Sequence, residues 1–134
     1  MDQQVEKMVK KMTPQELIEE KIYQIVALGN YEAAYLFSTE GLPMAHAASS
    51  GEVDPDRLAE MSIMFQDVQR LAATMGGIKR LHEVYIEGSN HRKVIFRTLI
   101  AFGENVVLAA VVAPGKTYRK HTNDLQKLIQ AIEF

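Results

Sequence analysis

Residues 106–112 constrain the fold of this chain more than any other part of its sequence. They read Val-Val-Leu-Ala-Ala-Val-Val, and Pro114-Gly115 follows shortly after them. Neighbouring side chains of a strand point to opposite faces of a sheet, so a strand of this composition is apolar on both faces. Such a strand is stable in the middle of a sheet that has helices above and below it. The run is also far shorter than the about 20 residues that a membrane helix needs.

Helices are expected on both sides of this strand. Residues 13–16, Thr-Pro-Gln-Glu, form a capping box with proline at the first helical position, and the helix they begin ends at Gly29. Asp54, which is followed by proline, begins the longest helix of the chain, and this helix ends near Gly76. A final helix is expected at residues 117–132, where apolar side chains recur on one side.

The other periodic segments are expected to be strands. Residues 31–38 and 43–48 flank a short polar segment and predict a hairpin. After residue 80 the apolar period changes to two, which predicts a three-stranded meander. Its strands are expected at residues 81–87, 93–101 and 105–113. The element order is therefore helix, two strands, helix, three strands, helix.

Length and charge limit the class of protein. The chain has 134 residues, which fits one domain, expected at residues 13–134, after an amphipathic extension at residues 1–12 that forms a short helix. This extension is too charged to be a signal peptide, and the absence of cysteine favours a reducing cytoplasm. A net charge of −2 argues against a dedicated nucleic-acid-binding protein, and no segment predicts membrane insertion.

No motif in the sequence predicts catalysis. Residues 110–117, Ala-Val-Val-Ala-Pro-Gly-Lys-Thr, have the strand, glycine, lysine and threonine order of a phosphate-binding loop. Ala110 stands where that loop has its first glycine, however, and Pro114 removes a backbone donor. The four histidines, His46, His82, His91 and His121, lack the spacing of a metal site. We therefore expect no enzyme activity, no catalytic residue, no cofactor and no metal.

A basic cluster precedes and begins the last predicted helix. Lys116, Arg119 and Lys120 lie where cations oppose the helix dipole, so the helix itself gains nothing from them. One interpretation is a basic patch that binds an acidic partner or an anion. The alternative is a group of solvated side chains in the first turn.

The longest helix and the strand after it carry the sharper signal. Apolar side chains recur along the helix at steps of three and four, and Met64 and Leu71 widen their stripe. Methionine side chains suit adaptable interfaces. Residues 81–87 begin the meander and predict an edge strand, which proteins cover or pair. These features favour dimerisation, while the alternative is that the same residues form the core of a monomer.

This pattern resembles the Roadblock family, small domains that include regulators of Ras-like GTPases. The resemblance covers residues 14–132. It rests on residues 38–45, Ser-Thr-Glu-Gly-Leu-Pro-Met-Ala, on the long helix with alanine and methionine, and on the meander closed by a helix. It implies an α+β fold in which helices sandwich a five-stranded antiparallel sheet. It also implies a homodimer joined by residues 81–87 and 56–75, with an interface expected at Met61, Phe65, Val84, Tyr85 and Ile86.

The resemblance implies a function as well. Some members of the family bind a Ras-like GTPase and accelerate its hydrolysis, and others only hold complexes together. We therefore expect a cytoplasmic, non-enzymatic signalling platform that binds itself and regulates a small GTPase. A structural adaptor without effect on nucleotide turnover is the first alternative. A small-molecule sensor with a cleft between sheet and helix is the second.

Overall fold

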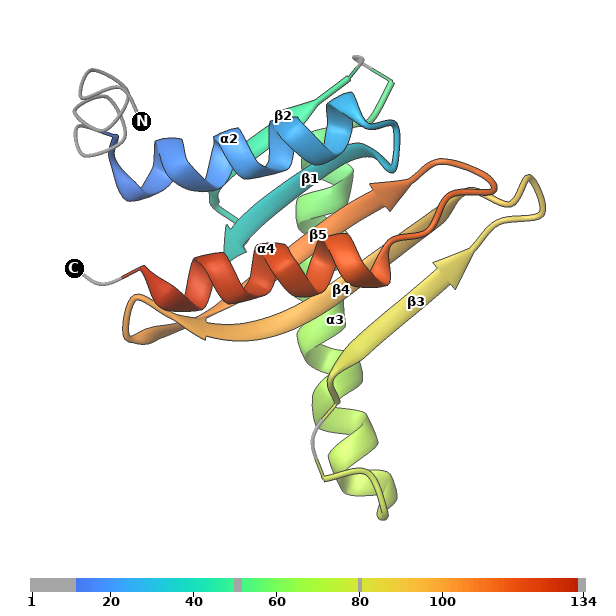
Figure 1. Ribbon diagram of the computed structural model, residues 1–134. Helices are drawn as coiled ribbons and strands as arrows, with labels where there is room; N and C mark the ends of the chain where they lie inside the picture. Colours follow the sequence, from blue (N-terminus) through green and yellow to red (C-terminus); the bar gives the residue numbers. More distant parts are fainter. Residues whose placement is uncertain (1–11, 50–51, 80, 133–134) are drawn as a thin grey trace.

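A computed structural model describes residues 12–49, 52–79 and 81–132 (Figure 1). The α+β class and the element order predicted from the sequence are confirmed. The expected helix within residues 1–12 lies outside the described residues, apart from Met12. The elements are α2 (Pro14–Ala27), β1 (Tyr31–Ser38), β2 (Pro43–Ala48), α3 (Pro55–Met75), β3 (Glu83–Glu87), β4 (Lys93–Ala101), β5 (Glu104–Val112) and α4 (Arg119–Ala131).

Side-chain caps fix where α2 and α3 begin. The Thr13 hydroxyl accepts a hydrogen bond from the backbone N–H of Glu16 at 3.1 Å and donates one to its carboxylate at 3.1 Å. The Asp54 carboxylate accepts from the N–H of Asp56 at 3.0 Å. Helix α4 has no side-chain cap and begins at Arg119, two residues after the start expected at residue 117. Without a capping side chain, nothing in its sequence marks the first residue of α4.

The five strands form one antiparallel sheet in the order β2-β1-β5-β4-β3. Strand β5 lies in the middle, as its two apolar faces predict, and residues 106–112 are buried. Helices α2 and α4 lie on one face of the sheet, and α3 crosses the other face (Figure 1). The sheet is therefore sandwiched by helices, as the resemblance implied.

Each face of the sheet carries its own core. The first, which we call the two-helix core, joins α2 and α4 to the sheet and includes Ile18, Ile22, Leu108, Leu125 and Ile129. The second, which we call the α3 core, includes Tyr35, Phe37, Phe65, Phe96 and Val107. Alternate residues of β5 enter the two cores, because successive side chains of a strand point to opposite faces.

Helix α3 extends beyond the sheet. Its buried residues are Leu58, Ser62 and Phe65, all in the first half of the helix. The second half projects past the sheet and ends well outside it (Figure 1). The apolar stripe predicted along the whole helix is thus buried near its start and exposed near its end.

Strand β3 is shorter than the sequence predicts. It pairs with β4 only from Glu83, opposite Arg97, to Glu87, opposite Lys93. Residues 81 and 82 were predicted to belong to this strand but lie outside it. The Gln69 side chain on α3 donates a hydrogen bond to the Leu81 carbonyl at 3.2 Å. The chain passes from the end of α3, on one face of the sheet, to the sheet edge, and it therefore begins to pair with β4 only at Glu83. Among the described residues, no strand consequently pairs with residues 98–101 of β4 on their outer side.

Candidate functional site

Large apolar side chains are exposed along α3, including its projecting half, and on the edge strand β3. Met75 is 74% exposed and Leu71 is 64% exposed. Soluble monomers seldom expose many large apolar side chains side by side, and such patches mark protein interaction sites. We call this surface the α3–β3 patch. Its exposed members are Ile63, Met64, Val68, Leu71, Met75 and Ile86, whereas the exposed Tyr85 faces the side of the sheet that carries α4.

The five interface residues predicted from the sequence lie at different depths. Tyr85 and Ile86 are exposed on β3. Met61 and Val84 are half-buried against the α3 core. Phe65 is 2% exposed, and its ring lies 5.9 Å from that of Phe96. Within one chain, Phe65 is therefore a core residue.

Other residues of α3 present more surface than the predicted ones. Met64, Leu71 and Met75 are each more than half exposed, although none of them was selected as an interface residue. For Leu71 and Met75, the signal that could have found them is their place near the end of a helix too long for the sheet it crosses. Met64 lies in the middle of α3 and is exposed because it is about 100° around the helix from the buried Phe65. Helical periodicity gives the face of a residue, but not the point at which the underlying sheet ends.

A buried polar network holds β3 against α4. The Arg97 guanidinium, 4% exposed, donates from Nε to the Glu83 carboxylate at 2.7 Å and from Nη1 to the Asn123 side-chain oxygen at 2.7 Å. It also donates to Gln126 at 3.2 Å, and the Tyr118 hydroxyl donates to Glu83 at 2.9 Å. Burial raises the pKa of Tyr118, so this hydroxyl keeps its proton. The network ties the edge strand to two other elements.

Sequence reasoning missed this network. The sequence feature that could have indicated the network is Arg97, a charged residue at an inward-facing position between the buried residues Ile95 and Leu99 of β4. A charge at such a position needs a partner nearby, because burying an unpaired charge is costly. The partners come from β3 and α4, and only the folded chain brings them together.

The predicted basic patch lies at the surface. Lys116, Arg119 and Lys120 are exposed, and in the part of the chain that the structure describes none of them forms an ion pair. Tyr118, in the same segment, stacks on Tyr85 of β3 with ring centres 6.2 Å apart. The basic patch therefore lies near Tyr85, on the face of β3 that carries α4.

The histidines are distributed over separate parts of the molecule. His46 stacks on Tyr35 with ring centres 5.0 Å apart, and His91 lies 3.9 Å from the Glu87 carboxylate. Residues 12–49, 52–79 and 81–132 contain no group of three or more acidic or histidine side chains that could hold a metal ion. Nor does any described helix have the length and apolar character needed to cross a membrane.

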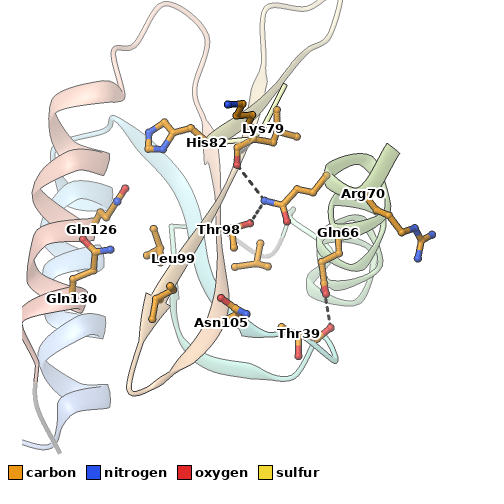
Figure 2. Close-up of a pocket in the computed structure, with 14 residues that line it drawn as sticks. Thr39, Gln66, Arg70, Lys79, His82, Thr98, Leu99, Asn105, Gln126 and Gln130 are labelled. Atoms are coloured by element: carbon orange, nitrogen blue, oxygen red, sulfur yellow. Dashed lines mark hydrogen bonds between the residues drawn. The ribbon is translucent and has the colours of Figure 1, made fainter. Parts of the chain in front are cut away.

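A groove runs along the outer edge of β4, between α3 and α4 (Figure 2). Its volume is about 740 Å³. Gln69 donates to the Thr98 hydroxyl at 2.6 Å, and Gln66 donates to the Thr39 carbonyl at 2.7 Å. These two bonds hold α3 at one wall of the groove, which we call the β4 groove. Its other polar lining residues are Arg70, Lys79, His82, Asn105, Gln126 and Gln130.

The β4 groove differs from the cleft that a small-molecule sensor would need. Small-molecule sites are usually enclosed and lined mostly by apolar side chains. Here the walls carry many side-chain amides, and Leu81, Leu99, Ile100 and Val107 are the apolar exceptions. The groove suits a polar chain better than a compact apolar ligand.

Comparisons by sequence find no match, either among family models or among curated proteins. Comparison with solved structures does find similar folds. An MglB structure with a tetrameric arrangement has a TM-score of 0.71 at 20% identity, over 89% of this chain and 89% of that chain. The gliding protein MglB from Thermus thermophilus has a TM-score of 0.70 at 20% identity, over 89% of this chain and 90% of that one.

A Roadblock/LC7 domain from Streptomyces avermitilis is also similar. Its TM-score is 0.61 at 16% identity, over 84% of this chain and 92% of that domain. At these identities the likeness concerns the fold. The resemblance to the Roadblock family that was seen in the sequence is thereby confirmed for the architecture: the chain has a Roadblock-type fold.

Proposed function

We propose that this protein is a homodimeric platform that binds a small Ras-like GTPase and regulates its nucleotide turnover. The observation that carries the proposal is the α3–β3 patch, a large exposed apolar surface on a Roadblock-type fold. The family resemblance of the sequence adds the GTPase, and the absence of cysteine favours the cytoplasm as the place of this work.

The form of α3 supports a twofold dimer. Its projecting half exposes Leu71 and Met75 and has no sheet of its own chain to pack against. A second copy offers the same helix face, so one patch covers the other in a self-complementary interface. Strand β3 also has an unpaired outer edge at which a second sheet can join. One of the similar MglB structures has a tetrameric arrangement, which is consistent with association of this fold.

We further propose that the protein contributes no catalytic group of its own. In Ras-like GTPases the catalytic groups belong to the GTPase and, in many cases, to a supplied arginine. A platform can act instead by changing the arrangement of the GTPase's own residues. The basic patch of Lys116, Arg119 and Lys120 is the surface that we assign to an acidic face of a partner.

Two measurements test this function together. The purified protein is mixed with each small Ras-like GTPase of its own genome, loaded with GTP, and complex formation and phosphate release are followed in the same sample. Binding with faster release identifies an activator. Binding with unchanged release identifies the adaptor alternative. If none of the GTPases binds, the proposed partner is wrong.

A further inference from the structure

The outer edge of β4 is open over its last residues. Strand β3 ends its pairing at Glu83, opposite Arg97, whereas β4 continues to Ala101. On the inner side, β5 pairs with β4 along the whole length of that strand, as far as Ala101 opposite Glu104. In the part of the chain that the structure describes, residues 98–101 therefore have a partner strand on one side only. An open edge of this kind is a template for another strand.

The hairpin between β4 and β5 shows which backbone groups face this opening. Phe102 and Gly103, both with positive φ, form its two-residue turn between Ala101 and Glu104. The pair next to such a turn exchanges both of its hydrogen bonds, and the direction alternates at each residue along the strand. The N–H and C=O of Ile100 consequently point away from β5.

The hydrogen bond at the other end of β4 indicates the same alternation in the direction of the backbone groups. The N–H of Gly88 donates to the Arg92 carbonyl at 2.9 Å, so Arg92 faces the β3 side. Even-numbered residues of β4 therefore present their backbone groups to the β3 side, and Ile100 is one of them. Its side chain is 56% exposed, so this position is accessible.

The charge of the β4 groove indicates what kind of chain fits this edge. Its lining includes Arg70, Lys79 and His82 and no carboxylate. Arg70 forms an ion pair with the exposed Asp67, with 2.9 Å between the guanidinium nitrogen and the carboxylate oxygen. Lys79 has no ion-pair partner among the described residues. Glutamine amides on α3 and α4 border the two faces of the edge (Figure 2). The groove thus favours polar and acidic side chains.

We propose that the β4 groove binds an extended acidic peptide segment of a partner protein, which adds a strand beside Ile100. In this mode of recognition, backbone hydrogen bonds supply affinity and alternate side chains supply specificity. Side chains of the peptide would face Gln66 and Gln69 on one side and Gln126 and Gln130 on the other. The peptide would lie beside β4, in line with β3, and would leave the outer edge of β3 free. This binding site is therefore separate from the proposed dimer interface and from the proposed binding of a GTPase.

The test uses the full chain and a defined probe. The probe is a fluorescein-labelled octapeptide that alternates glutamate with threonine or valine, and its counterpart carries lysine in place of each glutamate. Fluorescence anisotropy measures binding. We expect the acidic peptide to bind at least about tenfold more tightly than the lysine peptide. In the complex, hydrogen exchange of the Ile100 amide should slow by about tenfold or more, because this N–H becomes bonded.

A backbone variant makes the test specific. Ile100→Pro removes only an outward N–H, and proline is tolerated on the free side of an edge strand. Its binding of the acidic peptide should fall by at least about tenfold, while Ile100→Val, which keeps the N–H, should stay within about threefold of the parent. Lys79→Glu should weaken binding without touching the strand, and Lys127→Glu, at an exposed lysine outside both the groove lining and the basic patch, is its matched control.

Three results would overturn the proposal. One is that the acidic peptide fails to bind at millimolar concentration. Another is that Ile100→Pro, shown by circular dichroism to be folded, binds as Ile100→Val does. The last is that the Ile100 amide becomes protected in the protein alone as its concentration rises, which would mean that a second copy fills the groove. None of these results depends on whether a GTPase binds elsewhere.

Discussion

The two faces of the sheet are covered in different ways. On one face, α2 and α4 close the two-helix core completely, and Ile22, Leu125 and Ile129 have no exposed surface. On the other face, α3 alone covers the sheet, and only the first half of that helix is buried. Apolar side chains of similar type thus serve folding on one face and remain available for association on the other. Apolar periodicity alone does not distinguish these two uses.

The largest effect should come from truncating the two-helix core. Leu125→Ala removes a fully buried side chain and should lower the free energy of unfolding by about 3–5 kcal/mol. Leu71→Ala, the same change on the exposed half of α3, should cost about 0.5 kcal/mol or less in the monomer. Urea unfolding at concentrations where the chain is monomeric measures both. Equal losses would show that the two faces are alike.

The next effect concerns the polar network that holds the edge strand. Arg97→Met removes the cation beside the Glu83 carboxylate, which keeps only the Tyr118 hydroxyl as a donor, and takes the Arg97 donor from the Asn123 and Gln126 side-chain oxygens. We therefore expect a loss of about 2–3 kcal/mol in the free energy of unfolding. Arg92→Met is the matched control near the start of the same strand, because its pair with Glu32 is more exposed. It should cost about 1 kcal/mol or less. Similar losses for the two variants would contradict a special role for the network.

The α3–β3 patch should affect association more than folding. Leu71→Glu places a charge in the proposed dimer interface and should raise the dimer dissociation constant by about tenfold or more. Ala73→Glu is the control, because Ala73 is exposed on the opposite face of α3, and it should leave the constant nearly unchanged. Light scattering over a dilution series measures both. If Leu71→Glu associates as the parent does, α3 is not the dimer interface.

Sequence reasoning located the elements well because their signals are local. The caps at Thr13 and Asp54 and the double-sided apolar pattern of β5 each arise within a few residues. The Roadblock-type fold was implied by a resemblance that rests on residues 38–45, the long helix and the meander closed by a helix. The network around Arg97 and the early end of β3 depend on contacts between distant elements, so no short stretch of sequence contains them.

The candidate site was predicted less completely than the fold. Tyr85 and Ile86, expected at a dimer interface, are exposed within one chain, whereas Phe65, expected there too, is buried against the sheet. The β4 groove had no signal in the sequence. It exists because the pairing of β3 with β4 begins only at Glu83, while the Leu81 carbonyl accepts a hydrogen bond from Gln69 on α3.

The smallest effect compares one tyrosine from each core at high pH. Burial raises the pKa of Tyr31, in the two-helix core, to about 12, against an ordinary value of about 10. The folded chain therefore keeps a proton that the unfolded chain loses. The contribution of this group to the free energy of unfolding is fully present below pH 10. The free energy of unfolding should then fall by about 1.4 kcal/mol per pH unit as the pH rises from 10 towards 12. Tyr31→Phe should flatten this slope in urea unfolding curves.

Tyr35, in the α3 core, supplies the control for that slope. Burial raises its pKa too, but this residue is 7% exposed, whereas Tyr31 is 1% exposed. Tyr35→Phe should therefore change the slope less than Tyr31→Phe does. An equal change in the two variants would mean that the α3 core excludes water as well as the two-helix core. The contrast between the two faces would then lie only in the projecting half of α3.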